Sequence, residues 1–326
     1  MLWLRGSSLT VIADLCHFGT PEWIGGFQDP ALPIHHAAYA RAFAKRYPWI
    51  RHYTPVNEIF VAATFSAMLG WWNECLTDPV AFARALRHLS LAHELAVEAI
   101  LEVRPDAVIV QAESAERFEP ADSSAGATAG AAFWNAARFA ALDLTLGRTP
   151  APEMRALLSE AGMTTADYSF FREPRARGRR WIGVDYYVTS EHVVHANGSR
   201  AIAPRRAGLA AVAGAYHARY GLPLFITETS RESGLAVDWL AEQWGEVQRL
   251  AAAGIPVVGF TWFPLIDTVD WQHALRIARA DVDRIGLHSL DRAPHVVAGA
   301  YAELIASAGR SPIAGMEQGR DGLRVG

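Results

Sequence analysis

Residues 79–113 (PVAFARALRHLSLAHELAVEAILEVRPDAVIVQAE) contain the pattern that decides the fold. The stretch Pro79–Arg104 has apolar and aromatic residues at helical spacing, which predicts an amphipathic helix. The stripe consists of Phe82, Leu86, Leu89, His93 and Val97. The next run, Ala107–Gln111 (AVIVQ), is short and almost entirely apolar, which favours a buried strand. A long helix that leads directly into a buried strand is typical of a parallel α/β sheet.

The same alternation extends in both directions along the chain. The candidate strands are Leu9–Leu15, His52–Val56, Ala107–Gln111, Trp181–Tyr187, Pro223–Thr227 and Pro256–Trp262. The candidate helices are His35–Tyr47, Pro79–Arg104, Gly130–Leu146, Ala207–Tyr220 and Asp238–Ala253. Strands that are apolar throughout predict a parallel sheet covered on both faces. We expect loops at Ser114–Gly130 and at the basic run Arg172–Arg180. No internal repeat or linker divides the sequence, so we predict one domain over residues 1–326.

Composition narrows the class of function. The chain has 326 residues, 51% hydrophobic, and a net charge of −4, which gives no reason to expect nucleic acid or an anionic membrane as a partner. Eleven tryptophans fit core packing, or a flat ligand such as a sugar that stacks on indole rings. The two cysteines, Cys16 and Cys75, are too few for a disulfide framework, so we expect a cytoplasmic protein. The histidines lack a metal-ligand pattern.

Polar side chains follow each candidate strand at its carboxyl end. They include His17, Asn57-Glu58, Glu113, Asp185-Tyr186-Tyr187 and Glu228, with Trp262 at the end of the last strand. In a parallel barrel this edge forms the active site. Two carboxylates facing each other there can act on a glycosidic bond, one as proton donor and the other as nucleophile. The residues alone do not tell which carboxylate takes which role.

Five motifs in order resemble those of glycoside hydrolase family 1, the β-glucosidase and β-galactosidase family. Thr54-Pro-Val-Asn57-Glu58 is similar to the Thr-Phe-Asn-Glu-Pro acid/base motif, and Phe225-Ile-Thr-Glu228-Thr to the Ile-Thr-Glu-Asn-Gly nucleophile motif. The other three matching segments are Cys16–Trp23, Gly183–Tyr187 and Trp262–Trp271. The segment Arg284–Pro294 resembles the closing strand of the family and the turn that follows it.

This resemblance implies a (β/α)8 TIM-type barrel and a retaining, exo-acting β-glycosidase. It makes Glu58 the acid/base residue and Glu228 the nucleophile. The substrate-binding residues that it implies are His17, Asn57, Tyr187, Trp262, Asp270 and Trp271, with Tyr187 donating a hydrogen bond to the nucleophile. An acid at position 270 repels a phosphate, so a neutral sugar is favoured. The expected partner is a small β-glycoside or oligosaccharide, and no metal or organic cofactor is implied.

The sequence also departs from the family pattern. The family has two βα units, worth ~60 residues of a ~250-residue barrel, before the strand that leads to His17. We therefore expect a barrel incomplete at its N-terminus, with about six βα units, that lacks the strand-one Gln and the strand-two Arg of the family. Ile59 replaces the proline after the acid/base motif, and Thr229-Ser230 replaces Asn-Gly. Glu113 matches no family residue and is left out of the predicted site.

Two other functions remain open. The first is an inactive sugar-binding or scaffold homologue, which the absent arginine favours. The second is a transglycosylase that uses the same two glutamates with an acceptor other than water. Taken singly, these residues also fit non-catalytic roles. His17 could be a histidine of the core, and Glu58 or Glu228 could be a surface acid at the end of a strand.

Overall fold

The computed structural model describes residues 1–173 and 175–308. Six strands form one sheet in the order β1-β2-β3-β5-β8-β9. They are β1 (Ile12–Asp14), β2 (His52–Thr54), β3 (Val108–Ser114), β5 (Arg180–Asp185), β8 (Leu224–Glu228) and β9 (Val257–Phe260). The pairs β1·β2, β2·β3, β5·β8 and β8·β9 are all parallel. Each of the six strands predicted from an apolar run is therefore present, and the fold is α/β.

The described chain forms two compact units. Unit 1 comprises Met1–Ser114, Phe118–Trp181 and Val193–Ala201. Unit 2 comprises Ala115–Arg117, Ile182–His192 and the chain from Ile202 onward. The single domain expected over residues 1–326 stays a prediction, and its last part, residues 309–326, lies outside the described residues.

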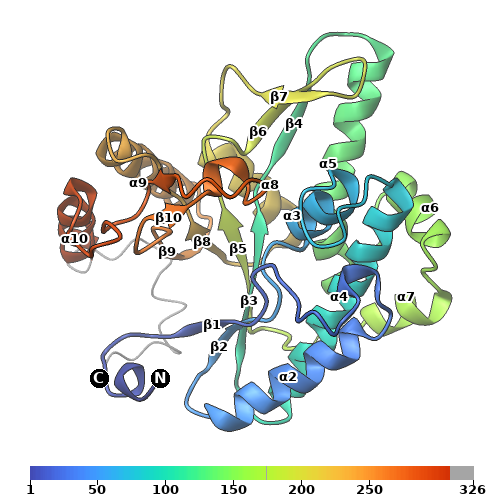
Figure 1. Cartoon of the computed structure of the whole chain (residues 1–326), viewed down its shortest axis with the longest axis horizontal. Helices are drawn as coiled ribbons and strands as arrows, with labels where there is room; N and C mark the ends of the chain where they lie inside the picture. The colour runs from blue at the N-terminus through green and yellow to red at the C-terminus, as the bar shows by residue number, and fades with distance from the viewer. Residues whose placement is uncertain (174, 309–326) are drawn as a thin grey trace. The chain divides into compact units, whose positions relative to one another are not determined.

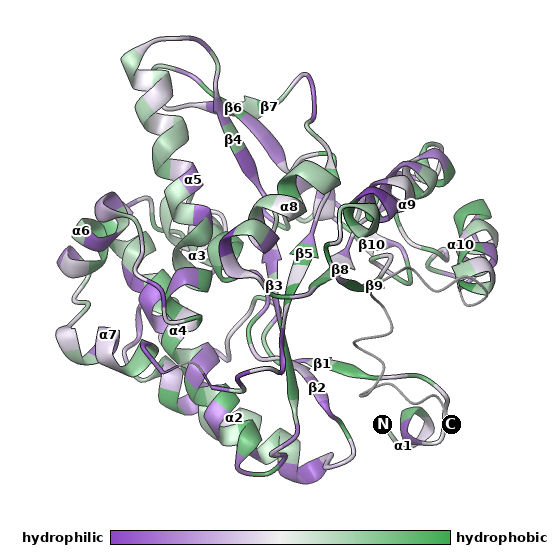
Figure 2. Ribbon diagram, turned by 180° about the vertical axis from the view of Figure 1, so that it is seen from behind, coloured by the Kyte–Doolittle hydropathy of each residue, from purple (hydrophilic) through white to green (hydrophobic). Residues whose placement is uncertain are grey.

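In unit 1, α2 (Leu32–Arg46) and α4 (Pro79–Leu101) lie side by side (Figure 1). The helix α4 begins after Asp78, whose carboxylate accepts a hydrogen bond from the Ala81 N–H at 2.7 Å. Such a cap satisfies one of the N–H groups that have no partner inside the helix. Along α4, hydrophobic and hydrophilic segments alternate (Figure 2), as expected of a helix with one buried face. The predicted stripe is buried, which confirms the interpretation of the periodicity.

The core of unit 1 joins these helices to the strands. One cluster of buried residues combines Ala40 and Ala44 of α2 with Val97 and Ile100 of α4, and includes Ile109 of β3. A second cluster is built around Ile59 to Ala63, which form the short helix α3, and extends into α4 and α5. The remaining helical segments of this unit are α1 (Leu2–Arg5), η1 (Gly26–Gln28), α3 (Ile59–Ala63), the π-helical η2 (Thr64–Met68), α5 (Ala125–Thr145), α6 (Pro152–Glu160) and α7 (Thr165–Phe171).

Unit 2 carries the last two strands of the parallel sheet with the helices that follow them. Helix α8 (Leu209–Tyr220) packs against α9 (Ala236–Ala252), and α9 packs against α10 (Val296–Ala308) (Figure 1). The strands β10 (Thr268–Val269) and β11 (Val282–Asp283) pair antiparallel, with η3 (Trp271–His273) between them. A further three-stranded sheet, most of whose residues are assigned to unit 1, has the order β4-β6-β7. Its strands are Arg117–Pro120, Glu191–Val194 and Arg200–Ile202.

Two segments expected to be loops are more ordered than that. Ser114–Gly130 contains β4 and the start of α5, which begins after Ser124 because its hydroxyl accepts from the Ala127 N–H at 3.2 Å. Within Arg172–Arg180, Arg180 is the first residue of β5 and is only 5% exposed. Its Nη2 donates to both oxygens of the Glu94 carboxylate, at 2.7 and 2.8 Å. The charge is buried because it is paired, so the expectation of a solvated loop was wrong for Arg180.

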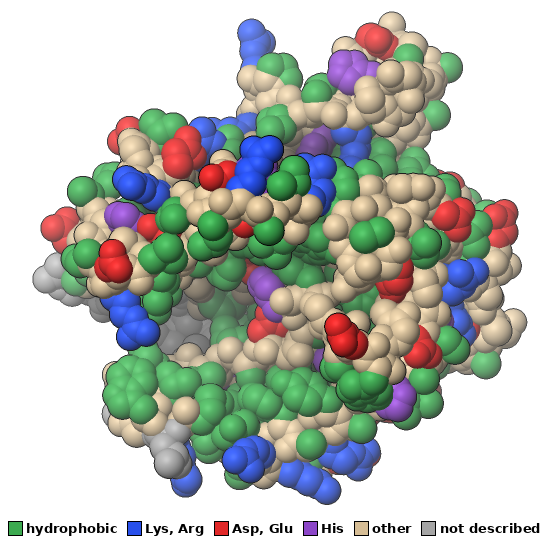
Figure 3. All heavy atoms as spheres, in the orientation of Figure 1, with side chains coloured by type: hydrophobic (Ala, Val, Ile, Leu, Met, Phe, Trp, Pro, Cys, Tyr) green, Lys and Arg blue, Asp and Glu red, His purple; other side chains and the backbone are tan. Residues whose placement is uncertain are grey.

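The surface of the described residues is mixed in charge. Figure 3 shows Lys and Arg side chains along the edge formed by α2, whose last turn contains Lys45 and Arg46. Across the described part of the chain, no helix is long and apolar enough to cross a membrane.

Candidate active site

Glu58 is placed by the carboxyl ends of β1, β2 and β3. The Asn57 N–H donates to the Cys16 carbonyl at 3.0 Å, and the Glu58 N–H donates to the Ala112 carbonyl at 3.0 Å. Backbone hydrogen bonds to the neighbouring segments are thus made by Asn57 and Glu58, the third and fourth residues beyond the end of β2. Glu58 then adopts a left-handed backbone conformation, with φ of 43°, and α3 begins at the next residue. Its side chain is 7% exposed. An acidic residue at this sharp bend is held by the backbone on both sides.

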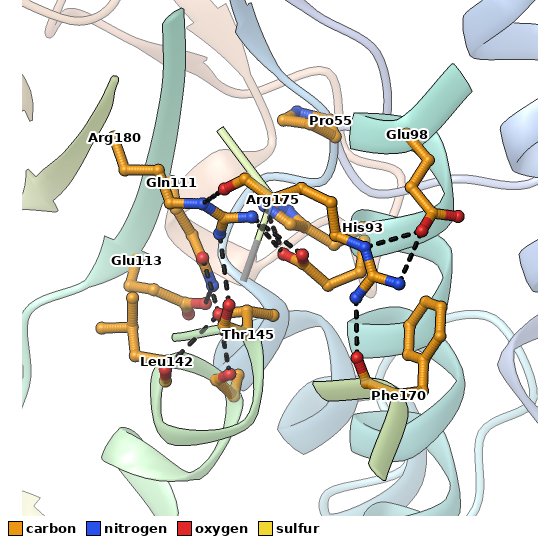
Figure 4. Close-up of polar contacts among 12 residues, drawn as sticks. Pro55, His93, Glu98, Gln111, Glu113, Leu142, Thr145, Phe170, Arg175 and Arg180 are labelled. Carbon is orange, nitrogen blue, oxygen red and sulfur yellow. Dashed lines mark hydrogen bonds and ion pairs between the residues drawn. The ribbon is translucent and has the colours of Figure 1, made fainter. Parts of the chain in front are cut away.

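Glu113, which was left out of the predicted site, lies next to this bend. It accepts a hydrogen bond from the Phe60 N–H at 3.2 Å. It accepts another from the Gln111 amide at 3.4 Å (Figure 4). Burial raises the pKa of Glu113 to about 7, although the hydrogen bonds from Phe60, Gln111 and Ile59 oppose the rise. Its position after a strand was the available sequence signal, but the contact with Phe60 spans 53 positions.

Asn57 and His17 lie at the same edge of unit 1. The Asn57 side chain is 2% exposed, and its Nδ2 has no hydrogen-bond partner among residues 1–173 and 175–308. A buried amide donor without an acceptor is unfavourable, so this group is suited to a ligand oxygen. The His17 ring is anchored through Nδ1, which lies 2.7 Å from the Asp14 carboxylate. That contact fixes the orientation of the ring and makes Nδ1 the donor when the imidazole is neutral.

A series of aromatic side chains in mutual contact begins at His17. The rings of His17 and Phe18 have centroids 4.4 Å apart, and those of Phe18 and Trp72 are 4.8 Å apart. Phe65 packs against both Trp71 and Trp72, with centroid distances of 4.7 Å in each case. The pair Trp71-Trp72 is a visible sequence signal, but it lies between predicted elements and could not be placed. The structure therefore adds an aromatic wall beside His17.

In unit 2, Glu228 is the last residue of β8, and a tyrosine from the neighbouring strand end contacts it. The Tyr187 hydroxyl donates to Glu228 Oε2 at 2.6 Å. The Tyr186 N–H donates to the Glu228 carbonyl at 2.9 Å, and Asp185 is the register partner of Glu228. The hydrogen bond that the resemblance implies between Tyr187 and Glu228 is thus present. It stabilises the ionised carboxylate over the neutral acid.

The three remaining predicted residues of unit 2 are tied to its own backbone. The Trp262 indole N–H donates to the Ile285 carbonyl at 2.9 Å, and Trp262 is 4% exposed. The Asp270 carboxylate accepts three backbone hydrogen bonds, each of 3.0 Å, from consecutive residues 279 to 281. Desolvation raises the pKa of Asp270, but these donors outweigh it and the net shift is downward. The Trp271 N–H donates to Asp283 at 2.7 Å.

The structure therefore brings the predicted residues together in sets. His17, Asn57 and Glu58 lie at one strand edge of unit 1, whereas Tyr187 and Glu228 are in contact in unit 2. Asp270 and Trp271 lie at the β10–β11 hairpin. Within the described ranges, no group of three or more His, Cys, Asp or Glu residues is arranged to hold a metal ion.

Comparison with known proteins identifies the family and the fold of the chain. The family model described as glycosyl hydrolase family 1 matches residues 4–212, which is more than half of the chain. The α/β fold and this match define a glycosidase of the TIM-barrel type, of which the described chain contains six parallel strands. The chain belongs to glycosyl hydrolase family 1, and at the level of the family it is a β-glycosidase.

Solved structures support the fold. A β-glucosidase from Thermotoga maritima in complex with deoxynojirimycin is 18% identical, with a TM-score of 0.78 over 94% of this chain and 75% of that one. The AHE enzyme from Alicyclobacillus herbarius is 20% identical, with a TM-score of 0.79 over 93% of this chain and 76% of that one. At such identities the likeness shows the fold alone. No curated protein matches the chain.

Proposed function

We propose that the protein is a retaining, exo-acting β-glycoside hydrolase for a neutral sugar, with Glu228 as nucleophile and Glu58 as acid/base. The observation that carries the proposal is the 2.6 Å hydrogen bond from Tyr187 to Glu228 at the end of β8. A nucleophilic carboxylate has to be ionised and held still, and a tyrosine hydroxyl supplies both conditions. The family model matches residues 4–212, a range that includes Glu58, and this membership supports a glycosidase reaction. The assignment of Glu228 depends on its motif and on its contact with Tyr187.

The proposed reaction has two displacement steps. Glu228 attacks the anomeric carbon while Glu58 gives its proton to the departing glycosidic oxygen, which leaves as the alcohol. Glu58 then takes a proton from a water molecule, whose oxygen attacks the anomeric carbon of the glycosyl-enzyme and releases Glu228. Two inversions give net retention. This chemistry needs the two carboxyl groups ~5 Å apart.

The other predicted residues receive binding roles in this proposal. The buried, unpartnered Nδ2 of Asn57 suits a sugar hydroxyl beside the anomeric carbon, and His17 suits a second hydroxyl. Trp262 would form the platform under the sugar ring, and Asp270 and Trp271 would bind its distal hydroxyls. The β-glucosidase from Thermotoga maritima forms complexes with the sugar-like ligands deoxynojirimycin and glucoimidazole, which supports a small glycoside as the ligand here. The two free cysteines support the cytoplasmic location that we propose.

A chromogenic assay tests the proposal. Aryl β-glucosides and β-galactosides are incubated with the parent, Glu58→Gln and Glu228→Gln, with Glu102→Gln as a matched control. Glu102 lies in an exposed ion pair with Arg41, so its loss is expected to leave activity unchanged. We expect activity in the parent and the control and its loss in both variants. NMR of the first-formed sugar should show the β-anomer. A parent that binds sugars without hydrolysing them would contradict the proposal.

A further inference from the structure

Glu113 is a buried acid that the proposed reaction does not use. It lies in β3, is 0% exposed, and has neutral hydrogen-bond donors as its contacts. A carboxyl group in such a place destabilises the fold when ionised unless it satisfies donors that would otherwise be left without an acceptor. The role of Glu113 therefore follows from the hydrogen-bond donors that would lose their acceptor without it.

The donor that depends on it most is at the start of α3. Phe60 is the second residue of this helix, and its N–H has no acceptor inside the helix because none precedes it. In most helices the side chain of the residue before the first turn accepts from these N–H groups. Glu58 occupies that position here, but its side chain does not cap the helix. Glu113 accepts from the Phe60 N–H instead, at 3.2 Å.

Three consecutive residues of β3, Gln111 to Glu113, contribute to the hydrogen bonds that fix the backbone bend at Glu58. The Ala112 carbonyl accepts from the Glu58 N–H at 3.0 Å, and Glu113 accepts from Phe60. The Gln111 amide donates to Glu113, and its own oxygen accepts from the Thr145 hydroxyl at 2.8 Å (Figure 4). The carboxyl group of Glu113 is thus fixed by a chain of hydrogen bonds that ends on α5.

We propose that Glu113 is a positioning residue for Glu58: by accepting from the first turn of α3, it holds Glu58 in its left-handed backbone conformation, so that the Glu58 side chain does not cap the helix. This inference rests on the proposed function. Without Glu113, the Phe60 N–H loses its acceptor, and Glu58 occupies the N-cap position, from which a side chain ordinarily accepts from this N–H. A carboxylate that caps a helix is stabilised in its ionised form, which makes it a poorer proton donor.

The kinetic test uses variants that differ in their hydrogen-bonding capacity. Glu113→Gln keeps an oxygen acceptor, whereas Glu113→Leu fills a similar volume without one. Each is assayed with phenyl and 2,4-dinitrophenyl β-glycosides, because departure of phenol needs a proton donor more than departure of dinitrophenol. We expect Glu113→Leu to lose at least about tenfold more kcat/KM on the phenyl glycoside than on the dinitrophenyl glycoside. Glu113→Gln should stay within about threefold of the parent on both.

A merely structural role gives a different result. If Glu113→Leu loses the same factor on both substrates, or loses nothing, the inference is overturned. If the parent hydrolyses neither glycoside, the proposed function fails, and a crystal structure of Glu113→Leu then decides on Glu113 alone. We expect φ of residue 58 to leave the left-handed region and the Glu58 carboxylate to accept from the Phe60 N–H. A φ that stays positive overturns the inference. If Glu113→Leu does not fold, Glu113→Ala takes its place in both measurements.

Discussion

The two motif glutamates are held in different ways. In unit 1, Glu58 sits at a bend whose backbone is hydrogen-bonded to β3, and the bend continues into a helix tied to Glu113. In unit 2, Glu228 is the last residue of β8, and its side chain accepts a hydrogen bond from the Tyr187 hydroxyl. The first residue is therefore controlled through the main chain and the second through its side chain. A single substitution can adjust Glu228, whereas the geometry of Glu58 depends on a whole segment.

The largest expected effect separates the roles of the two acids. Glu228→Gln should lower kcat by at least about 10⁴-fold on every glycoside, because no covalent intermediate can form. Glu58→Gln should lose about 10²- to 10⁴-fold on phenyl glycosides and much less on dinitrophenyl glycosides in the first, glycosylation step. Pre-steady-state kinetics with both substrates measure this difference. If both variants lost the same factor in rate on both substrates, the separate roles of Glu58 as acid/base and Glu228 as nucleophile would be contradicted.

The buried ion pair between Glu94 and Arg180 is expected to stabilise unit 1, which also contains Glu58. Glu94→Ala leaves the guanidinium of Arg180 buried without its bidentate partner. We expect unit 1 to lose about 3–5 kcal/mol of unfolding free energy. Urea denaturation of Glu94→Ala beside the exposed control Glu102→Gln measures it. A loss below about 1 kcal/mol would mean that the pair is not buried in solution.

The pH dependence of stability tests the surroundings of Glu113. Its pKa is raised from 4.5 to about 7 in the folded protein, so folding opposes its ionisation. The unfolding free energy of the parent should therefore fall, relative to that of Glu113→Gln, as pH rises from about 4.5 to 7. The difference should approach about 3 kcal/mol above pH 7 and vanish below pH 4. Denaturation series at pH 4, 5.5 and 7.5 provide the measurement, and parallel curves would contradict a buried carboxyl.

The smallest effect concerns the side-chain control of Glu228. Tyr187→Phe removes the 2.6 Å hydrogen bond and leaves the ring in place. We expect kcat to fall about tenfold, since a hydrogen bond to a charged group contributes about 1.5–3 kcal/mol. The acidic limb of the kcat/KM profile should also move to higher pH, because the carboxylate loses a donor that favours ionisation. Unchanged kinetics would show that Glu228 needs no side-chain support.

Regular patterns in the sequence predicted most of the fold. Apolar runs gave all six strands of the parallel sheet, and helical periodicity gave α4 with its buried stripe. Helix α3 was missed because all five of its residues, Ile59 to Ala63, are buried, so no amphipathic pattern exists. The role of Arg180 was missed because its partner Glu94 lies 86 positions earlier in the chain, and an isolated arginine run indicates a solvated loop.

The parts of the candidate site that lie in short sequence motifs could be predicted. The parts that depend on contacts between distant segments could not. The strand-end positions of Glu58 and Glu228 and the contact of Tyr187 with Glu228 were expected from short sequence motifs, and the contact is present. The orphaned amide of Asn57 and the support of α3 by Glu113 depend on burial and on contacts between distant segments. No local pattern encodes those contacts, because each requires the fold to be known first.

The backbone of Glu58 has a consequence for sequence drift in this family branch. An L-residue with φ of 43° opposes folding by about 1 kcal/mol relative to glycine, whatever its side chain does. In descendants that have lost catalysis, position 58 is therefore expected to drift toward glycine or asparagine, because these residues relieve the strain. Under the proposed role of Glu58, a glutamate is expected to persist at this position only in lineages that keep the activity.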